Sequence, residues 1–544
     1  METTITKKNG KYITLALLVG FTYRILLSLQ GIDHTDLGFS NTFYQNIFTH
    51  PEAVTLHFNY YLTGLVGGLW YQLLPATGVL GFRLLEAITL TAAIYFTYKT
   101  FQRQLYNTRV AILAILLSFL FPFLVTTFHY NTLTFLFMAI SAWCYSKSLY
   151  SKQALWTFLT GVTIGLCFFV RIANITLLLL ILVPVVYALA TRQKTLARKL
   201  GGIMFIGMLC GTILVIGIMI LLGHLPYFLS GLHDNIARVD EGIWTLSGIL
   251  ALSYFRDLVN IILQILAIIG LGALYLQSSR ISSRWADVLR MILIITSLVL
   301  IATSLPYLSS MSLYTLLCAP IFYSITPKED KLQAAFVILA AYLYPMGNDS
   351  GIVNIYHWTA ALLIIPAVVG TYHTSYILRK GVFIYSLYIA AVMLWRAALY
   401  PYGESTPRWQ CTEKVQASLL NTYTTPEKAH DYRHIITAIQ EKTDNTPWLL
   451  IGNQASELYY ATGKLPYLGQ TQQKAYKGHK LYERLQYQHN RYQQLPVVVI
   501  LKKEHFLSDD DEEVQNTLRQ WMDDHDYHIV TDDDNLTIHQ PTTR

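Results

Sequence analysis

Apolar stretches long enough to cross a lipid bilayer recur along most of this chain, and they constrain its fold more than any other feature. A membrane-spanning helix needs about 20 mainly apolar residues, and about thirteen stretches approach that length. They lie near 12–30, 78–98, 110–128, 131–147, 155–170, 173–190, 202–222, 250–276, 289–305, 308–324, 332–345, 356–376 and 382–399. We therefore predict an α-helical polytopic membrane protein.

Charge is distributed unevenly and divides the chain into two parts. Residues 1–400 hold 13 of the 33 acidic and 25 of the 40 basic residues, so that 401–544 holds the other 20 and 15. With 53% apolar and 13% charged residues, the chain is too apolar for a soluble enzyme. We predict a transmembrane domain at 1–400 and a soluble domain at 401–544. The net charge of +7 does not indicate a nucleic-acid partner, because the bases are spread over short connectors.

The basic residues of the membrane part also predict its orientation. Of its 25 bases, 19 lie at the N-terminus or in alternate connectors, and the other connectors hold mainly acids. Because positively charged connectors stay in the cytoplasm, the N-terminus is expected inside. An odd number of spans then places the C-terminal domain outside the cytoplasm.

Two carboxylates, Asp33 and Asp36, follow the first apolar stretch and are expected on that same outer side. The first outer loop, 31–76, continues with two segments expected to be interfacial helices, Asn41 to Phe48 and Phe58 to Leu74. A second outer loop runs from His224 to Gly248 and is either a cover over a cavity or a plain solvated loop. Asp33 and Asp36 are either ordinary solvated loop acids or part of a site for a membrane-borne substrate.

The C-terminal domain has the pattern of a small α/β fold. Helices are predicted at Lys428 to Lys442, Ala455 to Thr462 and Asp511 to Asp523. Strands are predicted at Trp448 to Ile451, Val497 to Leu501, Tyr527 to Val530 and Leu536 to His539.

Three short motifs, with this topology, carry a resemblance to a known family. They are Asp36-Leu-Gly-Phe39, the glycine-containing span from Gly161 and Gly165 to Arg171, and the tail segment from Trp448-Leu-Leu-Ile-Gly-Asn453 to Tyr459-Tyr-Ala-Thr-Gly-Lys464. The chain resembles the GT-C fold glycosyltransferases, which include protein O-mannosyltransferases, aminoarabinose transferases and oligosaccharyltransferases. One departure is Leu37, which stands where that family usually has a second, adjacent acid.

The resemblance implies a glycosyltransferase of the bacterial inner (cytoplasmic) membrane. It would move a sugar from a polyprenyl-phosphate-linked donor to a glycan, lipid or protein acceptor on the outer face, by an inverting reaction. Such chemistry needs a base for the incoming acceptor and a cationic site for the departing phosphate. Asp36 is the expected general base, with Asp33 second.

Arginine suits the phosphate because its planar fork binds two oxygens and keeps its charge. Six bases lie outside the inner-face set, and all are arginines: Arg24, Arg83, Arg171, Arg238, Arg256 and Arg396. Arg83, Arg171 and Arg256 are the expected phosphate ligands, and snorkelling or pairing with an acid is the structural alternative. Further expected substrate-binding residues at outer ends of spans are His57, His129, Asn131, Asn174 and Asp349. No Cys/His spacing resembles a zinc site, and a requirement for a divalent metal stays open.

Two other classes share the membrane topology. A polytopic transporter or lipid-linked-sugar flippase would bind near the bilayer midplane and usually carries internal repeats. A polymerase or ligase of surface polysaccharide shares the substrate chemistry but usually lacks such a C-terminal domain.

Overall fold

The structure is a computed structural model of the whole chain. The residues that it describes are 2–33, 35–104, 107–121, 126–190, 192, 194–237, 254–256, 259, 270, 274, 277, 285–289, 291–293, 307–346, 351–356, 360–370, 376–416, 419–443, 446–472, 476, 479–503, 506 and 511–542.

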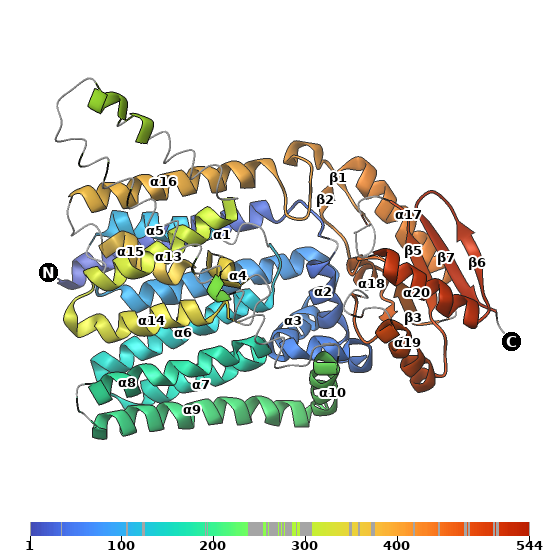
Figure 1. Ribbon diagram of the computed structural model, residues 1–544, viewed down its shortest axis with the longest axis horizontal. Coiled ribbons are helices and arrows are strands. Elements are labelled where there is room, and N and C mark those ends of the chain that lie inside the picture. Colours follow the sequence, from blue (N-terminus) through green and yellow to red (C-terminus); the bar gives the residue numbers. More distant parts are fainter. Residues whose placement is uncertain are drawn as a thin grey trace.

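Long apolar helices lie side by side and form one bundle (Figure 1). In chain order they are α1 (Glu2–Leu27), α4 (Gly78–Phe101), α5 (Thr108–Leu120), α6 (Tyr130–Ser151), α7 (Ala154–Val170), η3 (Ile172–Ile181) leading into α8 (Leu182–Ala190), α9 (Lys194–Leu221), α13 (Tyr307–Ile325), α14 (Lys331–Leu343), α15 (Ala360–Gly370) and α16 (Tyr376–Leu399). Among the described residues, five helical segments are long and apolar enough to cross a membrane. The predicted multi-pass α-helical membrane architecture is therefore confirmed.

The helices follow the predicted apolar stretches closely, with two exceptions. The stretches 250–276 and 289–305 fall mostly outside the described residues, so the predicted count of about thirteen spans stays a prediction. Helix α5 ends at Leu120, although the apolar stretch continues to 128. Pro122 follows two residues later in the sequence, and a proline has no backbone N–H with which to continue the hydrogen bonds of a helix.

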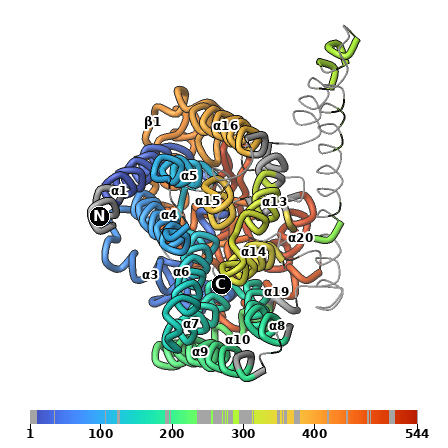
Figure 2. Tube along the Cα trace, turned by 90° about the vertical axis from the view of Figure 1, so that its left-hand side faces the viewer, coloured from blue at the N-terminus to red at the C-terminus, as the bar shows by residue number. Residues whose placement is uncertain are grey.

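Viewed from the N-terminal end, α1, α5 and α16 gather at one edge of the bundle and α7 and α9 at the opposite edge (Figure 2). Helices α7 and α9 approach through four glycines, Gly161 and Gly165 facing Gly207 and Gly211. A Cβ on any of the four would overlap a backbone carbonyl oxygen of the other helix. Small residues at four-residue spacing allow this close approach in membrane bundles. The glycine-containing motif thus has a direct packing role.

The first outer loop folds into a short helical layer at the end of the bundle opposite the N-terminus (Figure 1). It comprises α2 (Asp36–Asn46), η1 (Pro51–Tyr60), α3 (Tyr61–Leu73) and the single turn η2 (Pro75–Thr77). Helix α2 begins five residues before the expected Asn41. From the second outer loop, α10 (Leu225–Ala237) packs on η1, and the rest of that loop, 238–248, lies outside the described residues.

The C-terminal domain lies beyond this layer and contains a five-stranded sheet of order β4-β3-β5-β7-β6 (Figure 1). Its strands are β3 (Trp448–Ile451), β4 (Leu465–Pro466), β5 (Val497–Leu501), β6 (Tyr527–Asp532) and β7 (Leu536–Pro541), and its helices are α17 (Pro426–Lys442), α18 (Glu457–Thr462), α19 (His479–Tyr492) and α20 (Asp511–Asp524). Strands β4, β3 and β5 are parallel, whereas β7 is antiparallel to both β5 and β6. A two-stranded ribbon, β1 (Glu413–Lys414) with β2 (Tyr423–Thr424), joins this domain to the bundle. The predicted small α/β fold is confirmed.

Candidate functional site

The two expected carboxylates occupy different positions at the start of α2. The Asp33 carboxylate accepts the Leu37 N–H at 2.9 Å and the Thr35 hydroxyl at 3.4 Å, so it caps the helix. A carboxylate there satisfies an otherwise unpaired N–H and interacts favourably with the helix dipole. Asp36 is the first residue of α2, and its side chain is exposed. Asp33 therefore orders the start of α2, and Asp36 is the more exposed of the two acids.

Asp36 lies near two phenols from distant parts of the sequence, Tyr130 at the start of α6 and Tyr402 after α16. Burial, followed by the nearby charges of Asp33 and Asp36, raises the pKa of Tyr402 well above its ordinary value of 10. The Tyr402 phenol therefore stays protonated near neutral pH and can act as a hydrogen-bond donor. The Tyr60 ring stacks on Tyr130, with 4.4 Å between centroids.

Arg171 is brought to the same tyrosine from the end of α7. Its guanidinium carbon lies 5.1 Å from the centroid of the Tyr130 ring, and the residue is only 7% exposed. The backbone of Arg171 is extended, with φ −157° and ψ 128°, because α7 stops at Val170. Tyr130 thus lies against the Arg171 cation from the end of the fifth predicted span and within electrostatic reach of the Asp36 carboxylate.

Asn174 supports the position of Arg171 through hydrogen bonds to neighbouring residues. Its amide nitrogen donates to the Thr134 hydroxyl at 2.8 Å and to the Cys167 carbonyl at 2.9 Å. Its backbone N–H donates to the Arg171 carbonyl at 2.9 Å. These bonds stabilise the junction between α7 and η3, where Arg171 lies, and so help to fix the position of Arg171. The structure therefore places the Asn174 side chain within the fold, where it bonds to α6 and α7.

Arg83 serves the backbone of the Asp33 loop. It is 1% exposed, and its terminal nitrogens donate to the carbonyl groups of Ser28, Gln30 and Gly31, at 3.2 Å for Gln30 and 2.6 Å for Gly31. Both terminal nitrogens are therefore directed at the chain itself. The structure places Arg83 as a support for the loop that carries the acids, and its role as a phosphate ligand stays a prediction.

The remaining expected residues are distributed around this centre. His57 is fully buried and stacks on Phe39 at 3.8 Å between centroids. His129 caps α6 by accepting the Asn131 N–H at 3.4 Å. Arg256 is exposed on the short described segment 254–256, and Asp349 lies outside the described residues. Over the described parts of the chain, no group of three or more His, Cys, Asp or Glu residues is arranged to hold a metal ion.

The C-terminal domain clamps the loop that carries Asp33. The Glu404 carboxylate accepts the Ile32 N–H at 3.0 Å and the Thr424 hydroxyl at 2.7 Å. Lys428 donates to the other oxygen of Glu404 at 3.1 Å and to the Ile32 carbonyl at 3.0 Å. The Lys428 and Glu404 side chains are only 10% and 4% exposed. The backbone N–H and carbonyl of Ile32 are therefore both bonded to residues that follow α16, the last helix of the bundle.

Two glycines allow the acidic loop and α2 to approach the C-terminal domain closely. Gly31 has φ +97°, which favours glycine, and its N–H donates to the Tyr423 carbonyl at 2.8 Å. Gly38 of α2 lies against the start of α18, where a Cβ would overlap the backbone nitrogen of Glu457. Glu457 is fully buried beneath α2 and accepts a hydrogen bond from the Tyr432 hydroxyl. Burial raises the pKa of Glu457 well above its ordinary value of 4.5.

The comparisons with known proteins give a likeness to solved structures. No family model and no curated protein matches the chain. The structure is similar to the crystal structure of ArnT from Cupriavidus metallidurans in the apo state, with 15% sequence identity and a TM-score of 0.44 over 98% of each chain.

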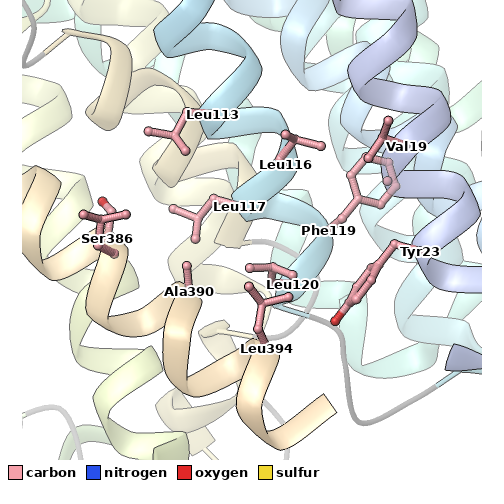
Figure 3. Close-up of a pocket in the computed structure, with 12 residues that line it drawn as sticks. Val19, Tyr23, Leu113, Leu116, Leu117, Phe119, Leu120, Ser386, Ala390 and Leu394 are labelled. Atoms are coloured by element: carbon pink, nitrogen blue, oxygen red, sulfur yellow. The ribbon is translucent and has the colours of Figure 1, made fainter. Parts of the chain in front are cut away.

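A separate cavity of about 270 Å³ opens between α1, α5 and α16 (Figure 3). Its walls are almost entirely apolar, with Tyr23 and Ser386 as the polar exceptions: Val19, Gly20, Tyr23, Leu113, Leu116, Leu117, Phe119, Leu120, Ser386, Leu387, Ala390 and Leu394. A cavity without charged residues suits a hydrocarbon chain. It lacks the carboxylate and the cation that sugar transfer from a phosphate needs.

Several important residues were not predicted from the sequence. Tyr402, Glu404, Lys428 and Glu457 all come close to the acidic loop through contacts between distant segments. The sequence around Asp33 did contain one usable signal, because an aspartate just before a helix is a common cap.

Proposed function

We propose that this protein is a membrane glycosyltransferase that moves a sugar from a polyprenyl-phosphate-linked donor to an acceptor at the end of the bundle covered by the C-terminal domain. The observation that carries the proposal is that Arg171 lies against Tyr130 while Asp36 is within electrostatic reach of the same phenol, with the base candidate exposed and the cation candidate largely buried. A carboxylate and an arginine are the two groups that this transfer needs.

In the proposed reaction, Asp36 accepts the proton of the acceptor hydroxyl or amine. The acceptor oxygen or nitrogen then forms a bond to the anomeric carbon from the side opposite the phosphate. The bond between that carbon and the phosphate oxygen breaks, and its electron pair leaves with the polyprenyl phosphate. Arg171 stabilises the charge on the departing phosphate, in surroundings whose burial strengthens the interaction. The configuration at the anomeric carbon is inverted.

The proposed setting is the bacterial inner membrane, with the N-terminus in the cytoplasm and the C-terminal domain outside. The N-terminus and that domain lie at opposite ends of the bundle, which supports this orientation (Figure 1). The 19 bases assigned to the cytoplasmic side by sequence give the direction. In this setting the donor reaches Asp36 from the outer leaflet, and the acceptor is a glycan, lipid or protein of the envelope.

The second candidate, a flippase for lipid-linked sugars, moves its substrate without breaking the sugar–phosphate bond. We would reconstitute the full chain in proteoliposomes with a panel of labelled polyprenyl-phosphate sugars and an envelope extract as the source of acceptor. The proposal expects release of free polyprenyl phosphate and transfer of the label to the acceptor. Movement of intact donor between leaflets, with no cleavage for any member of the panel, would favour the flippase instead.

A further inference from the structure

The end of the bundle opposite Asp36 contains a second cavity that the proposed reaction does not use. It has a volume of about 330 Å³ and lies where α4 and α6 reach the N-terminal side. Its lining residues are Tyr95, Lys99, Thr100, Gln102, Arg103, Trp143, Ser146, Lys147 and Tyr150. Three of these are basic, three are aromatic, and none is acidic.

The bases and rings of this cavity are paired. The Arg103 guanidinium lies 4.1 Å from the centroid of the Tyr150 ring, Lys99 lies 5.5 Å from Tyr95, and Lys147 lies 6.0 Å from Trp143. Such contacts hold long basic side chains beside an aromatic surface, and Lys99 also donates to the Gln102 amide oxygen at 3.1 Å. The result is a cationic recess with an aromatic wall.

One acid, Asp330, is hydrogen-bonded to the wall of the cavity. Asp330, at the start of α14, accepts the Tyr150 hydroxyl at 2.6 Å and the Gln104 amide at 3.0 Å. These bonds fix the Tyr150 wall of the cavity. Asp330 itself is not among the lining residues. The three bases therefore give the interior a net positive charge, and its ligand should be an anion.

We propose that this cavity binds the phosphodiester headgroup of an anionic glycerophospholipid. Basic pockets between membrane helices on the cytoplasmic side recognise such headgroups, and aromatic rings favour the membrane interface. A volume of about 330 Å³ accommodates a headgroup, whereas the acyl chains would extend along the bilayer-facing helices. The same anionic chemistry occurs in soluble phosphates, so the experiment includes both sources.

The test uses the full chain, delipidated in detergent and titrated with phosphatidylglycerol or phosphatidylcholine, and bound lipid is counted by native mass spectrometry. Each base near an anionic lipid contributes roughly a factor of five in affinity. Arg103→Gln/Lys147→Gln should therefore weaken phosphatidylglycerol binding by about 25-fold, with little effect on phosphatidylcholine. The matched control is Arg109→Gln/Lys152→Gln, which removes two bases at the same end that are absent from the lining.

The control variant should keep the affinity of the unmodified chain for phosphatidylglycerol. Equal losses in both double variants would assign the effect to general surface charge and overturn the proposal. Displacement of phosphatidylglycerol by glycerol phosphate at equal concentration would overturn it in favour of a soluble phosphate. Neither outcome bears on the sugar transfer proposed at the other end of the bundle.

Discussion

The Nζ of Lys428 lies 3.0 Å from the carbonyl oxygen of Ile32, the residue directly before Asp33, although 396 positions separate the two in the chain. Through this bond and the Glu404 carboxylate, the C-terminal domain determines where the acidic loop lies relative to the bundle. We infer that the C-terminal domain is a fixed support for the loop that carries Asp36, and that it does not move independently of the bundle.

The first prediction concerns this clamp. Lys428→Met leaves the Glu404 carboxylate buried without its cation, which typically costs about 3–5 kcal/mol. The double variant Lys428→Met/Glu404→Gln removes both charges and should recover part of that loss, since the two effects are coupled. Thermal unfolding of both single variants and the double variant measures the coupling. Strictly additive losses would show that the pair does not act as a unit.

A second prediction uses the buried acid beneath α2. Because burial raises the pKa of Glu457 in the folded chain, its contribution to stability is complete below about pH 4.5 and is lost as pH rises toward the raised value. Glu457→Gln keeps an acceptor for Tyr432 and removes this dependence. The variant should match the unmodified chain near pH 4.5 and become the more stable of the two as pH increases to about 8. Unfolding curves at several pH values provide the check, and a constant difference would refute the assignment.

The α7–α9 contact gives a third prediction. Gly161→Ala places a methyl group against the Met204 carbonyl and should destabilise the bundle by about 1–3 kcal/mol. At Gly202, also in α9, no atom lies within 4 Å of the position that a Cβ would take, so Gly202→Ala serves as the control and should not destabilise. Thermal unfolding in detergent distinguishes the two. Similar losses at both positions would mean that the close approach does not limit stability.

The fourth prediction separates two buried arginines at the same end of the bundle. Arg171→Lys keeps the charge but loses the planar fork, so the affinity for a polyprenyl-phosphate donor should fall, and Arg171→Ala should lower it further. Arg83→Lys loses donors to the backbone of the acidic loop, and its main effect should be on thermal stability. Donor binding and melting temperature are measured on all three. Unchanged donor binding in both Arg171 variants would give Arg171 a structural role.

Periodicity and composition predicted the elements of this chain better than its contacts. Trp448–Ile451 and Val497–Leu501 could be identified as strands because each is a continuous apolar run, and both are central in the sheet. Helix α19, His479–Tyr492, was missed because it is mainly polar and buries only Leu481, Leu485 and Gln488 on one face.

The candidate site could be predicted only in part, for a physical reason. The exposed Asp36 and the buried Arg171 stand out in sequence because charge is scarce around a membrane span. Tyr130 lies beside Arg171, and Glu404 and Lys428 hold the backbone of Ile32 ahead of the two acids. All three are ordinary residues whose importance comes from tertiary contacts between segments far apart in the chain. No spacing rule connects such pairs.

The most direct measurement is the rate of donor cleavage by Asp36→Asn, with Asp33→Asn as its matched control. An amide at Asp36 keeps the size of the side chain but cannot act as the base, and loss of a general base typically lowers the rate about 10²–10⁴-fold. An amide at Asp33 can still accept the Leu37 N–H, so that variant should retain both most of its activity and its melting temperature. The account predicts an inactive but fully folded Asp36→Asn variant. An active Asp36→Asn together with an inactive, folded Asp33→Asn would contradict it.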